Sequence, residues 1–552
     1  FNIGGTLMHF SEKPLTEKVN IGDELINNTI WGLNLSYNKS FMWLTNLVNK
    51  IPTVNATAPS TLSIQGEFAQ LIPHKKKTGS NSGSSFIDDF ETSQNTIDIR
   101  SPYSWFMAST PYDPSSDALF PEAALSNNID YGKNRALLAW YYIDRMFTQK
   151  NSSLCPAYLK NDLEQLSSPY VREVTTREIW PNRELNYGEA SAIQTLNLSF
   201  YPTERGPYNL DATNIDAAFN LLNPEKRWGG IMRKLDNTNF ESSNIEYIQF
   251  WMMDPFAVED ATNEGGDLYF NLGEVSEDIL KDGFKAYENG NPIDGSTKNM
   301  RETVWGRVST ETSLTYAFDN TAGARKFQDV GLNGLHTEAE FSFSTYSEYL
   351  KQLRAKLSPT KIAELELDQF SPFNDPAGDN YHYYRGYDYD EQQASILQRY
   401  KHYNGVEGNS LGEDDTKDNL YQSSRSVPDV EDINQDNTLN EYERYYQYHI
   451  SLRKEDMVVG QNYITDKQVS TVPLRNGKKE EVIWYQFKIP LKDYQKIVGS
   501  ISDFSTIRFI RMFMTGFKKE AHLRFATLEL VRGDWRSYDY DLNSRGDIPA
   551  EG

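Results

Sequence analysis

The sequence predicts an all-β protein: N-terminal strands of alternating polarity are followed by two antiparallel, jelly-roll-like β-sandwiches with a few helices. Three observations support this prediction. Aromatic residues make up 13% of the 552 residues while the mean hydropathy is −0.65, a combination that suits β-rich structure better than a helical bundle. Apolar and polar residues alternate near the N-terminus, and a strand pattern occurs twice further along the chain.

The N-terminal strands are predicted at residues 29–38 and 60–71, where side chains alternate with a period of two. The apolar side chains on one face are Trp31, Leu33, Leu35, Leu62, Ile64 and Phe68. Strands of about ten residues with aromatic ends are typical of transmembrane barrels. An ordinary sandwich strand with one wet face has the same period, and the period alone favours it. Both interpretations therefore stay open at this point.

The sandwiches are predicted from an internal repeat, in which residues 244–253 align with residues 506–515. The matched pairs are Ile245 with Ile507, Tyr247 with Phe509, Ile248 with Ile510 and Trp251 with Phe513. The first copy is preceded by a strand that begins at Trp228 and followed by one that begins at Asp267. In the second copy these strands begin at Trp484 and His522. Two copies of a three-strand pattern predict two related sandwiches.

Composition changes mark the domain boundaries. Residues 73–85, "PHKKKTGSNSGSS", are basic and then rich in Gly and Ser, as in a linker. Helical spacing is found at residues 41–51, 135–147 and 346–357. The predicted organisation is strands at 1–73, a linker at 74–85, a first sandwich with a helical insertion at 86–300, a second at 301–540 and an exit linker at 541–552.

Charge and cysteine content exclude some classes of function. The formal charge of −23 disfavours a nucleic-acid partner, because phosphate binding needs a basic surface. The single cysteine, Cys155, cannot form a disulfide within the chain, and no flanking motif marks it as reactive. No stretch approaches the roughly 18 apolar residues of a membrane helix. Because the chain opens in the middle of a pattern, we expect it to be part of a longer protein.

A calcium loop is predicted at "DINQDNTLNEYE", residues 432–443. The oxygen ligands at positions one, three, five, seven and twelve are Asp432, Asn434, Asp436, Thr438 and Glu443. Asn437 stands at position six, where Gly is usual, but Asn tolerates the left-handed conformation. The alternative is a solvated acidic turn. We expect a structural calcium ion rather than a sensor, because Pro428 spoils an entering helix.

A weaker calcium loop is found at residues 329–340, where Asp329, Asn333 and Glu340 occupy ligand positions but Gly331 leaves position three empty. No H-E-x-x-H, G-x-S-x-G or phosphate-binding loop occurs in the sequence. We therefore expect no enzymatic activity and no catalytic residues.

Several strings resemble one protein family, the SprA/Sov proteins, which are the outer-membrane translocons of the type IX secretion system. They are "FIDDFE", "RALLAWYYID", "NIEYIQFWMMDPF", "RYKHYNGVEGNS", "PDVEDINQDNTLNEYE" and "IRFIRMFMTGF", followed by "LRFATLELVRGDWR". The N-terminal "EKPLTEKVNIGDELINNTIWGL" looks like the barrel strands of the same family.

The resemblance implies an all-β fold of transmembrane β-barrel strands with two inserted sandwiches that form extracellular cap structure. It also implies the outer membrane of a Gram-negative bacterium, export of folded cargo proteins, and partners such as PorV and a plug protein. Leu33 and its five apolar neighbours listed above would then face lipid.

A second hypothesis is a calcium-stabilised extracellular protein that binds carbohydrate or degrades glycans through a β-sandwich. The first seventy residues discriminate between the two hypotheses, because such a protein has no use for strands with an apolar outer face. The same strands disfavour an adhesin.

Overall fold

A computed structural model describes most of the chain as two compact units, one of residues 1–94 with 533–552 and one of residues 95–532. The described residues are 1–11, 27–73, 77–78, 81–82, 94–149, 152–183, 185, 191–258, 260, 262–311, 315–410 and 424–533. The string "FIDDFE" at residues 86–91 and the exit linker at 541–552 lie outside them, as does the predicted linker apart from β4 (Lys77–Thr78) and β5 (Asn81–Ser82).

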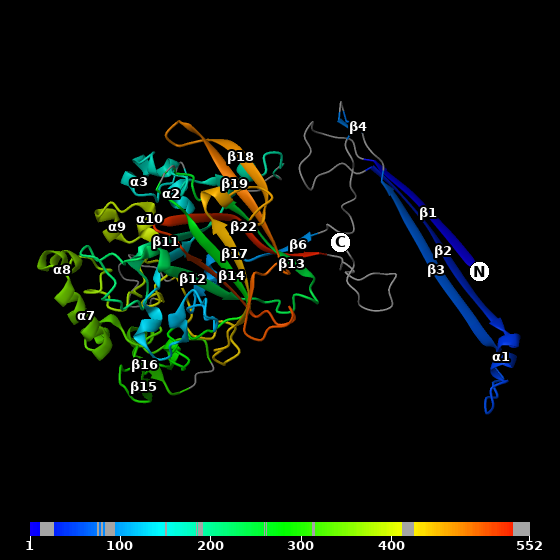
Figure 1. Cartoon of the computed structure of the whole chain (residues 1–552), viewed down its shortest axis with the longest axis horizontal. Helices are drawn as coiled ribbons and strands as arrows, with labels where there is room; N and C mark the ends of the chain where they lie inside the picture. The colour runs from blue at the N-terminus through cyan, green and yellow to red at the C-terminus, as the bar shows by residue number, and fades with distance from the viewer. Residues whose placement is uncertain are drawn as a thin grey trace. The chain divides into compact units, whose positions relative to one another are not determined.

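The N-terminal unit is a three-stranded antiparallel sheet in the order β1-β2-β3 (Figure 1). Its elements are β1 (Asn2–Ser11), β2 (Asn27–Phe41), α1 (Met42–Val48) and β3 (Ser60–Pro73). Both predicted strands and the helical segment between them are confirmed. In the register, Leu33 opposes Phe68 and Tyr37 opposes Ile64, so these residues share one face of the sheet.

The larger unit contains two large antiparallel sheets and the two-stranded sheets β9-β10 and β15-β16. The first has the order β18-β19-β13-β22-β11-β8, with β6 also paired to β22, and the second has the order β20-β17-β14-β21-β12-β7. Their bounds are β6 (Gln94–Asp98), β7 (Phe106–Met107), β8 (Ala136–Tyr141), β11 (Leu196–Arg205), β12 (Trp228–Lys234), β13 (Ile245–Met253), β14 (Gly266–Glu274), β17 (Arg444–Leu452), β18 (Ile464–Pro473), β19 (Lys479–Pro490), β20 (Lys496–Val498), β21 (Phe509–Thr515) and β22 (Ala521–Gly533).

The two sheets pack face to face around an apolar core. Phe250 of β13 stacks on Phe487 of β19 with ring centroids 4.8 Å apart, and it contacts Phe270 of the opposite sheet at 5.8 Å. All seven residues of β21 are buried. The mostly apolar segment 509–515, in which Arg511 and Thr515 are the polar residues, is therefore explained by a strand that is covered on both faces.

The strand order identifies this sandwich as a single jelly roll. Strands β19-β13-β22-β11 form one four-stranded run and β12-β21-β14-β17 form the other, as two Greek keys do. The middle strand of each repeat copy lies between the outer strands of the other copy: β13 between β19 and β22, and β21 between β12 and β14. The repeat is present, but the prediction of two separate sandwiches at 86–300 and 301–540 is wrong, because the copies interleave.

The predicted helix at residues 135–147 is also wrong over most of its length. Residues Ala136–Tyr141 form β8, in which every residue is buried, and only Arg145–Thr148 is helical, as α2. A short apolar run buried on both faces has no diagnostic period, so a strand and a helix look alike there.

Most helices lie in the long connection between β14 and β17, residues 275–443, and α7 to α9 gather on one side of the sandwich (Figure 1). The predicted helix at 346–357 is confirmed as α7. The remaining elements are α3 (Ala157–Asn161), β9 (Val174–Thr175), α4 (Thr176–Ile179), β10 (Ala192–Ile193), β15 (Met300–Glu302), β16 (Arg307–Ser309), α5 (Arg325–Gln328), α6 (Thr337–Glu340), α7 (Ser344–Lys356), α8 (Pro359–Leu365), α9 (Tyr387–Glu391) and α10 (Ile396–Tyr400). Among the described residues, no helix has the length and apolar character needed to cross a membrane.

Candidate functional site

In the loop at residues 432–443, the first acidic side chains accept hydrogen bonds from backbone N–H groups of the same turn. Asp432 accepts the backbone N–H of Asp436 at 3.0 Å and that of Asn437 at 2.9 Å, and Asp436 accepts the N–H of Thr438 at 2.9 Å. Asn437 has a φ of +66°, so the left-handed conformation expected at position six is confirmed. The loop is thus closed by its own side chains.

The structure gives two of the predicted ligands other partners. The Tyr316 hydroxyl donates to Asp432 Oδ2 at 2.7 Å, and Lys285 Nζ lies 3.2 Å from the same oxygen. Glu443 pairs with Arg511 through two bonds of 2.8 Å. Four of the five predicted ligands therefore share the turn, but Glu443 does not join them. The predicted twelve-residue ligand set is corrected in this respect, because a buried guanidinium holds the Glu443 carboxylate.

Glu277 provides a second support for the same loop. Its carboxylate accepts the backbone N–H groups of Ile433 at 2.6 Å, Asn434 at 3.3 Å and Asn440 at 3.3 Å. Burial raises the pKa of Glu277 to about 8, and the nearby Asp432 charge acts in the same direction. The backbone of this loop is therefore held by a side chain that lies more than 150 residues away in the sequence.

The predicted ligands of the weaker loop at residues 329–340 do not converge on one site. Asp329 accepts the N–H of Ser410 at 2.8 Å, whereas Asn333 donates to Glu340, so the two ends of the loop belong to different clusters. Gly331 has a φ of +76°, and a Cβ there would lie 2.4 Å from Asp379 Oδ2. The missing side chain at position three thus leaves room for a carboxylate from elsewhere.

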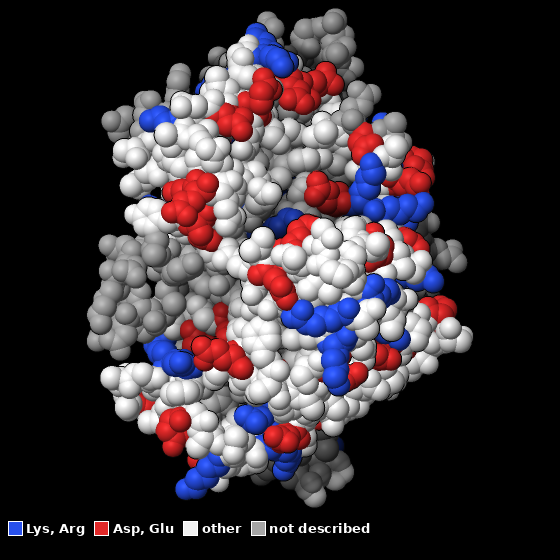
Figure 2. All heavy atoms as spheres, turned by 90° about the vertical axis from the view of Figure 1, so that its left-hand side faces the viewer, with Lys and Arg blue, Asp and Glu red and all other residues white. Residues whose placement is uncertain are grey.

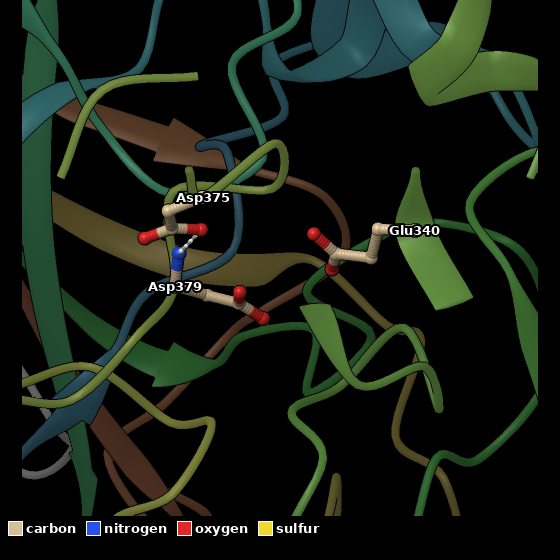
Figure 3. A group of neighbouring side chains, drawn as sticks. All are labelled: Glu340, Asp375 and Asp379. Carbon is tan, nitrogen blue, oxygen red and sulfur yellow. Dashed lines mark hydrogen bonds between the residues drawn. The ribbon is translucent and has the colours of Figure 1, made fainter. Parts of the chain in front are cut away.

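That carboxylate belongs to a buried acidic cluster of Glu340, Asp375 and Asp379 (Figure 3). One ligand atom from each residue lies within 4.8 Å of the others, and the three residues are at most 1% exposed. Glu340 ends α6, while Asp375 and Asp379 share the turn between α8 and α9. In Figure 3 the carboxylates of Glu340 and Asp379 point toward one another.

The hydrogen bonds of this cluster leave one oxygen without a partner. Asp375 accepts the N–H of Gly378 at 2.7 Å, Glu340 accepts that of Ala377 at 3.0 Å, and Asp379 Oδ2 accepts the Tyr208 hydroxyl at 2.6 Å. Asp379 Oδ1 is buried and has no hydrogen-bond partner. An unpaired buried oxygen of this kind costs free energy unless something else binds it.

No lysine or arginine of the described chain forms an ion pair with these three carboxylates. Arg205 lies nearby, but it donates to the backbone carbonyls of Asp375 and Pro376. Burial raises the pKa of Asp379 to about 8, and the neighbouring Asp375 charge adds to this shift. Burial also raises the pKa of Glu340, with Asp379 and Asp375 as further causes.

Sequence reasoning found Glu340 but missed its partners. The spacing of Asp375 and Asp379 in "DPAGD" was available as a signal, because carboxylates four residues apart in a Gly/Pro turn can converge. The helix and turn that bring them to Glu340 could not be inferred locally. Cys155 is buried, which raises the pKa of its thiol and agrees with an unreactive role.

The six predicted apolar residues of the N-terminal sheet lie on one of its faces. Leu33 on β2 opposes Phe68 on β3, and the other four are an even number of residues away from one of these two along the same strand. Their side chains are largely uncovered: Leu33 is 51% exposed and Phe68 is 55% exposed. Trp31 and Phe68 contact each other with ring centroids 5.2 Å apart. The opposite face is polar around Asn34, which is paired with Glu67, and apolar around Ile30, which is paired with Leu71 and Met8.

Acidic and basic side chains are interspersed over the face of the molecule drawn in Figure 2. Several basic side chains adjoin one another just below the centre of that face, with acidic side chains around them.

Residues 348–550 match the SprA_N family, which is described as a motility related/secretion protein. This match covers 203 of the 552 residues and supports the SprA/Sov resemblance of the sequence strings. The matched segment begins in α7 and includes strands β17 to β22 of the jelly roll, together with Asp375 and Asp379. No curated protein matches the chain. The matched domain indicates a motility- or secretion-related protein.

Proposed function

We propose that the chain is part of a protein-conducting translocon that exports folded cargo through a large β-barrel in the outer membrane of a Gram-negative bacterium. The N-terminal sheet would supply barrel strands, and the jelly roll would form extracellular cap structure. Partners would be cargo proteins, membrane lipid and barrel-associated proteins such as PorV and a plug protein. The family match supports a role in secretion.

The observation that carries the membrane assignment is the exposed apolar face of β1 to β3. From Trp31 to Phe41 the strand advances ten residues, or about 33 Å at about 3.3 Å per residue. At a tilt of about 45° this spans about 23 Å of membrane, close to the roughly 25 Å apolar band of outer-membrane barrels. Aromatic residues stand at both ends of the stretch, as in the girdles of such barrels.

The other face of the same sheet fits a water-filled interior. Asn34 and Ser36 on β2 lie across from Glu67 and Gln65 on β3. Strands of outer-membrane barrels alternate in this way, with apolar side chains toward lipid and polar ones toward the lumen.

The alternative, a glycan-binding sandwich, would use the cleft of about 710 Å³ on the outer face of the first sheet. Trp180 and Trp251 line this cleft with Gln249 and Gln486, and aromatic rings beside amides suit sugar binding. The exposed sheet β1 to β3 favours the translocon, because a secreted lectin gains nothing from it.

Two arginine substitutions on neighbouring residues test the membrane assignment. Leu33→Arg puts a charge on the apolar face and should cost about 2–4 kcal/mol near the midplane of the bilayer. Asn34→Arg, the matched control, puts the same charge on the polar face opposite Glu67 and should be tolerated. Outer-membrane insertion and cargo secretion, measured in cells for the full-length protein, should fail only in Leu33→Arg.

Equal insertion and secretion in the two variants would refute the lipid-facing assignment. Binding of a purified glycan through Trp180 and Trp251, together with that result, would favour the alternative.

A further inference from the structure

The buried cluster of Glu340, Asp375 and Asp379 brings three carboxylates together, and the nearby Arg205 guanidinium donates to the backbone carbonyls of Asp375 and Pro376 rather than to these carboxylates. Glu407 adds a fourth carboxylate nearby, and its Oε2 is likewise buried without a hydrogen-bond partner. A buried ionised carboxylate is stable only if it is paired, hydrogen-bonded or bound to a metal. The cluster therefore needs either bound protons or a cation.

We propose that Glu340, Asp375 and Asp379 bind a calcium ion, which Asp379 Oδ1 contacts directly. Asp379 is fully buried, its carboxylate points toward Glu340, and Oδ1 is the oxygen that no protein donor satisfies (Figure 3). The raised pKa values of Asp379 and Glu340 show how unfavourable the ionised cluster is without a cation.

The donor set favours calcium over other metals. All ligand atoms are oxygens, which hard cations prefer, whereas zinc sites normally include Cys or His. Oxygens on opposite sides of a calcium ion lie about 5 Å apart, which accommodates ligand atoms within 4.8 Å of one another. Magnesium keeps several of its waters, so an enclosed protein cage suits it less well.

The ion would join the long helical connection to the jelly roll. Tyr208, which follows β11, donates its hydroxyl to Asp379 and receives the N–H of Leu332 on the same oxygen. Arg205 of β11 holds the backbone of the Asp375 turn. A calcium ion on these carboxylates would thus fix α6 and the 375–379 turn against the end of β11. This role is structural and is independent of whether the protein conducts cargo.

Calcium-dependent stability of the intact chain tests the site. After chelation and gel filtration, calcium at about 100 times its Kd should raise Tm by about 3 °C or more, and magnesium should do so much less. Terbium should emit when Tyr208 or Tyr346 is excited, because both hydroxyls lie at the cluster. Asp379→Asn keeps the shape and an acceptor for Tyr208, yet it should lose most of the calcium shift and of the terbium emission.

Asp432→Asn, in the loop at 432–443, is the matched control and should keep both responses. The proposal is overturned if wild-type protein shows no calcium-dependent shift, since the cluster then holds protons. It is also overturned if Asp432→Asn loses the response while Asp379→Asn keeps it, because the loop would then be the site. Should Asp379→Asn fail to fold, the calcium content of purified wild-type protein decides: less than one tightly held ion per chain refutes the proposal.

Discussion

Arg511 and Glu443 form a two-bond ion pair inside the jelly roll, with Nη1–Oε1 and Nη2–Oε2 distances of 2.8 Å. The Arg511 side chain is fully buried and that of Glu443 is 4% exposed. Arg511 lies on β21, and Glu443 immediately precedes β17. Strand β14 lies between these two strands, so the pair bridges across it and anchors the end of the long connection to the centre of the sheet.

Removing one partner of this pair should destabilise the protein strongly. Arg511→Met leaves the Glu443 carboxylate buried and unpaired, which should lower the free energy of unfolding by about 3–5 kcal/mol. Adding Glu443→Gln should recover part of that loss, because the stranded charge is gone. Urea unfolding of both single variants and the double variant measures this coupling, and additive losses would contradict it.

Neither half of the jelly roll should fold alone. Strand β13 has both of its neighbours, β19 and β22, in the C-terminal half of the chain, so residues 95–300 lack its pairing partners. We expect residues 95–300 and 301–533 to be insoluble when expressed separately and to copurify when expressed together. Cooperative unfolding of either half by itself would contradict this expectation and support two separate sandwiches.

Two glycines with similar backbone angles should respond differently to alanine. Gly265 has a φ of +77° and a Cβ there would lie 1.8 Å from the Leu452 carbonyl oxygen, whereas Gly460, with a φ of +88°, has open space around it. Gly460→Ala should cost about 1 kcal/mol from the backbone alone. Gly265→Ala should cost at least about 2 kcal/mol more, because β17 must shift. Equal losses in thermal unfolding would show that the clash is relieved cheaply.

His522 should make the protein less stable in mild acid. Burial lowers its pKa to about 4, with the Lys401 charge as a second cause, and Ser199 Oγ lies 2.8 Å from Nδ1. The unfolded chain takes up the proton near pH 6.5, so the free energy of unfolding falls as the pH drops from about 6.5 to about 4. The loss from this group is about 3 kcal/mol. His522→Gln should flatten that part of the stability curve, and parallel curves for the two proteins would contradict the assignment.

The sequence by itself determined the two N-terminal strands and which of their side chains share a face. Alternation in residues 29–38 and 60–71 is a local property of the chain, and the register places Leu33 and Phe68 on one face as predicted. The left-handed Asn437 was predictable for the same reason, because side-chain sterics at one residue control φ.

Only the tertiary structure decided which strands pair and which carboxylates meet. The repeat around Trp251 and Phe513 predicted two sandwiches, but each middle strand pairs with strands of the other copy. Glu443 fitted position twelve of a calcium loop, yet Arg511 on β21 binds it. Glu340 meets Asp375 and Asp379 across the helices between them. Local patterns record whether a residue is buried, whereas its partners depend on contacts between segments far apart in the sequence, and a one-dimensional pattern does not contain these contacts.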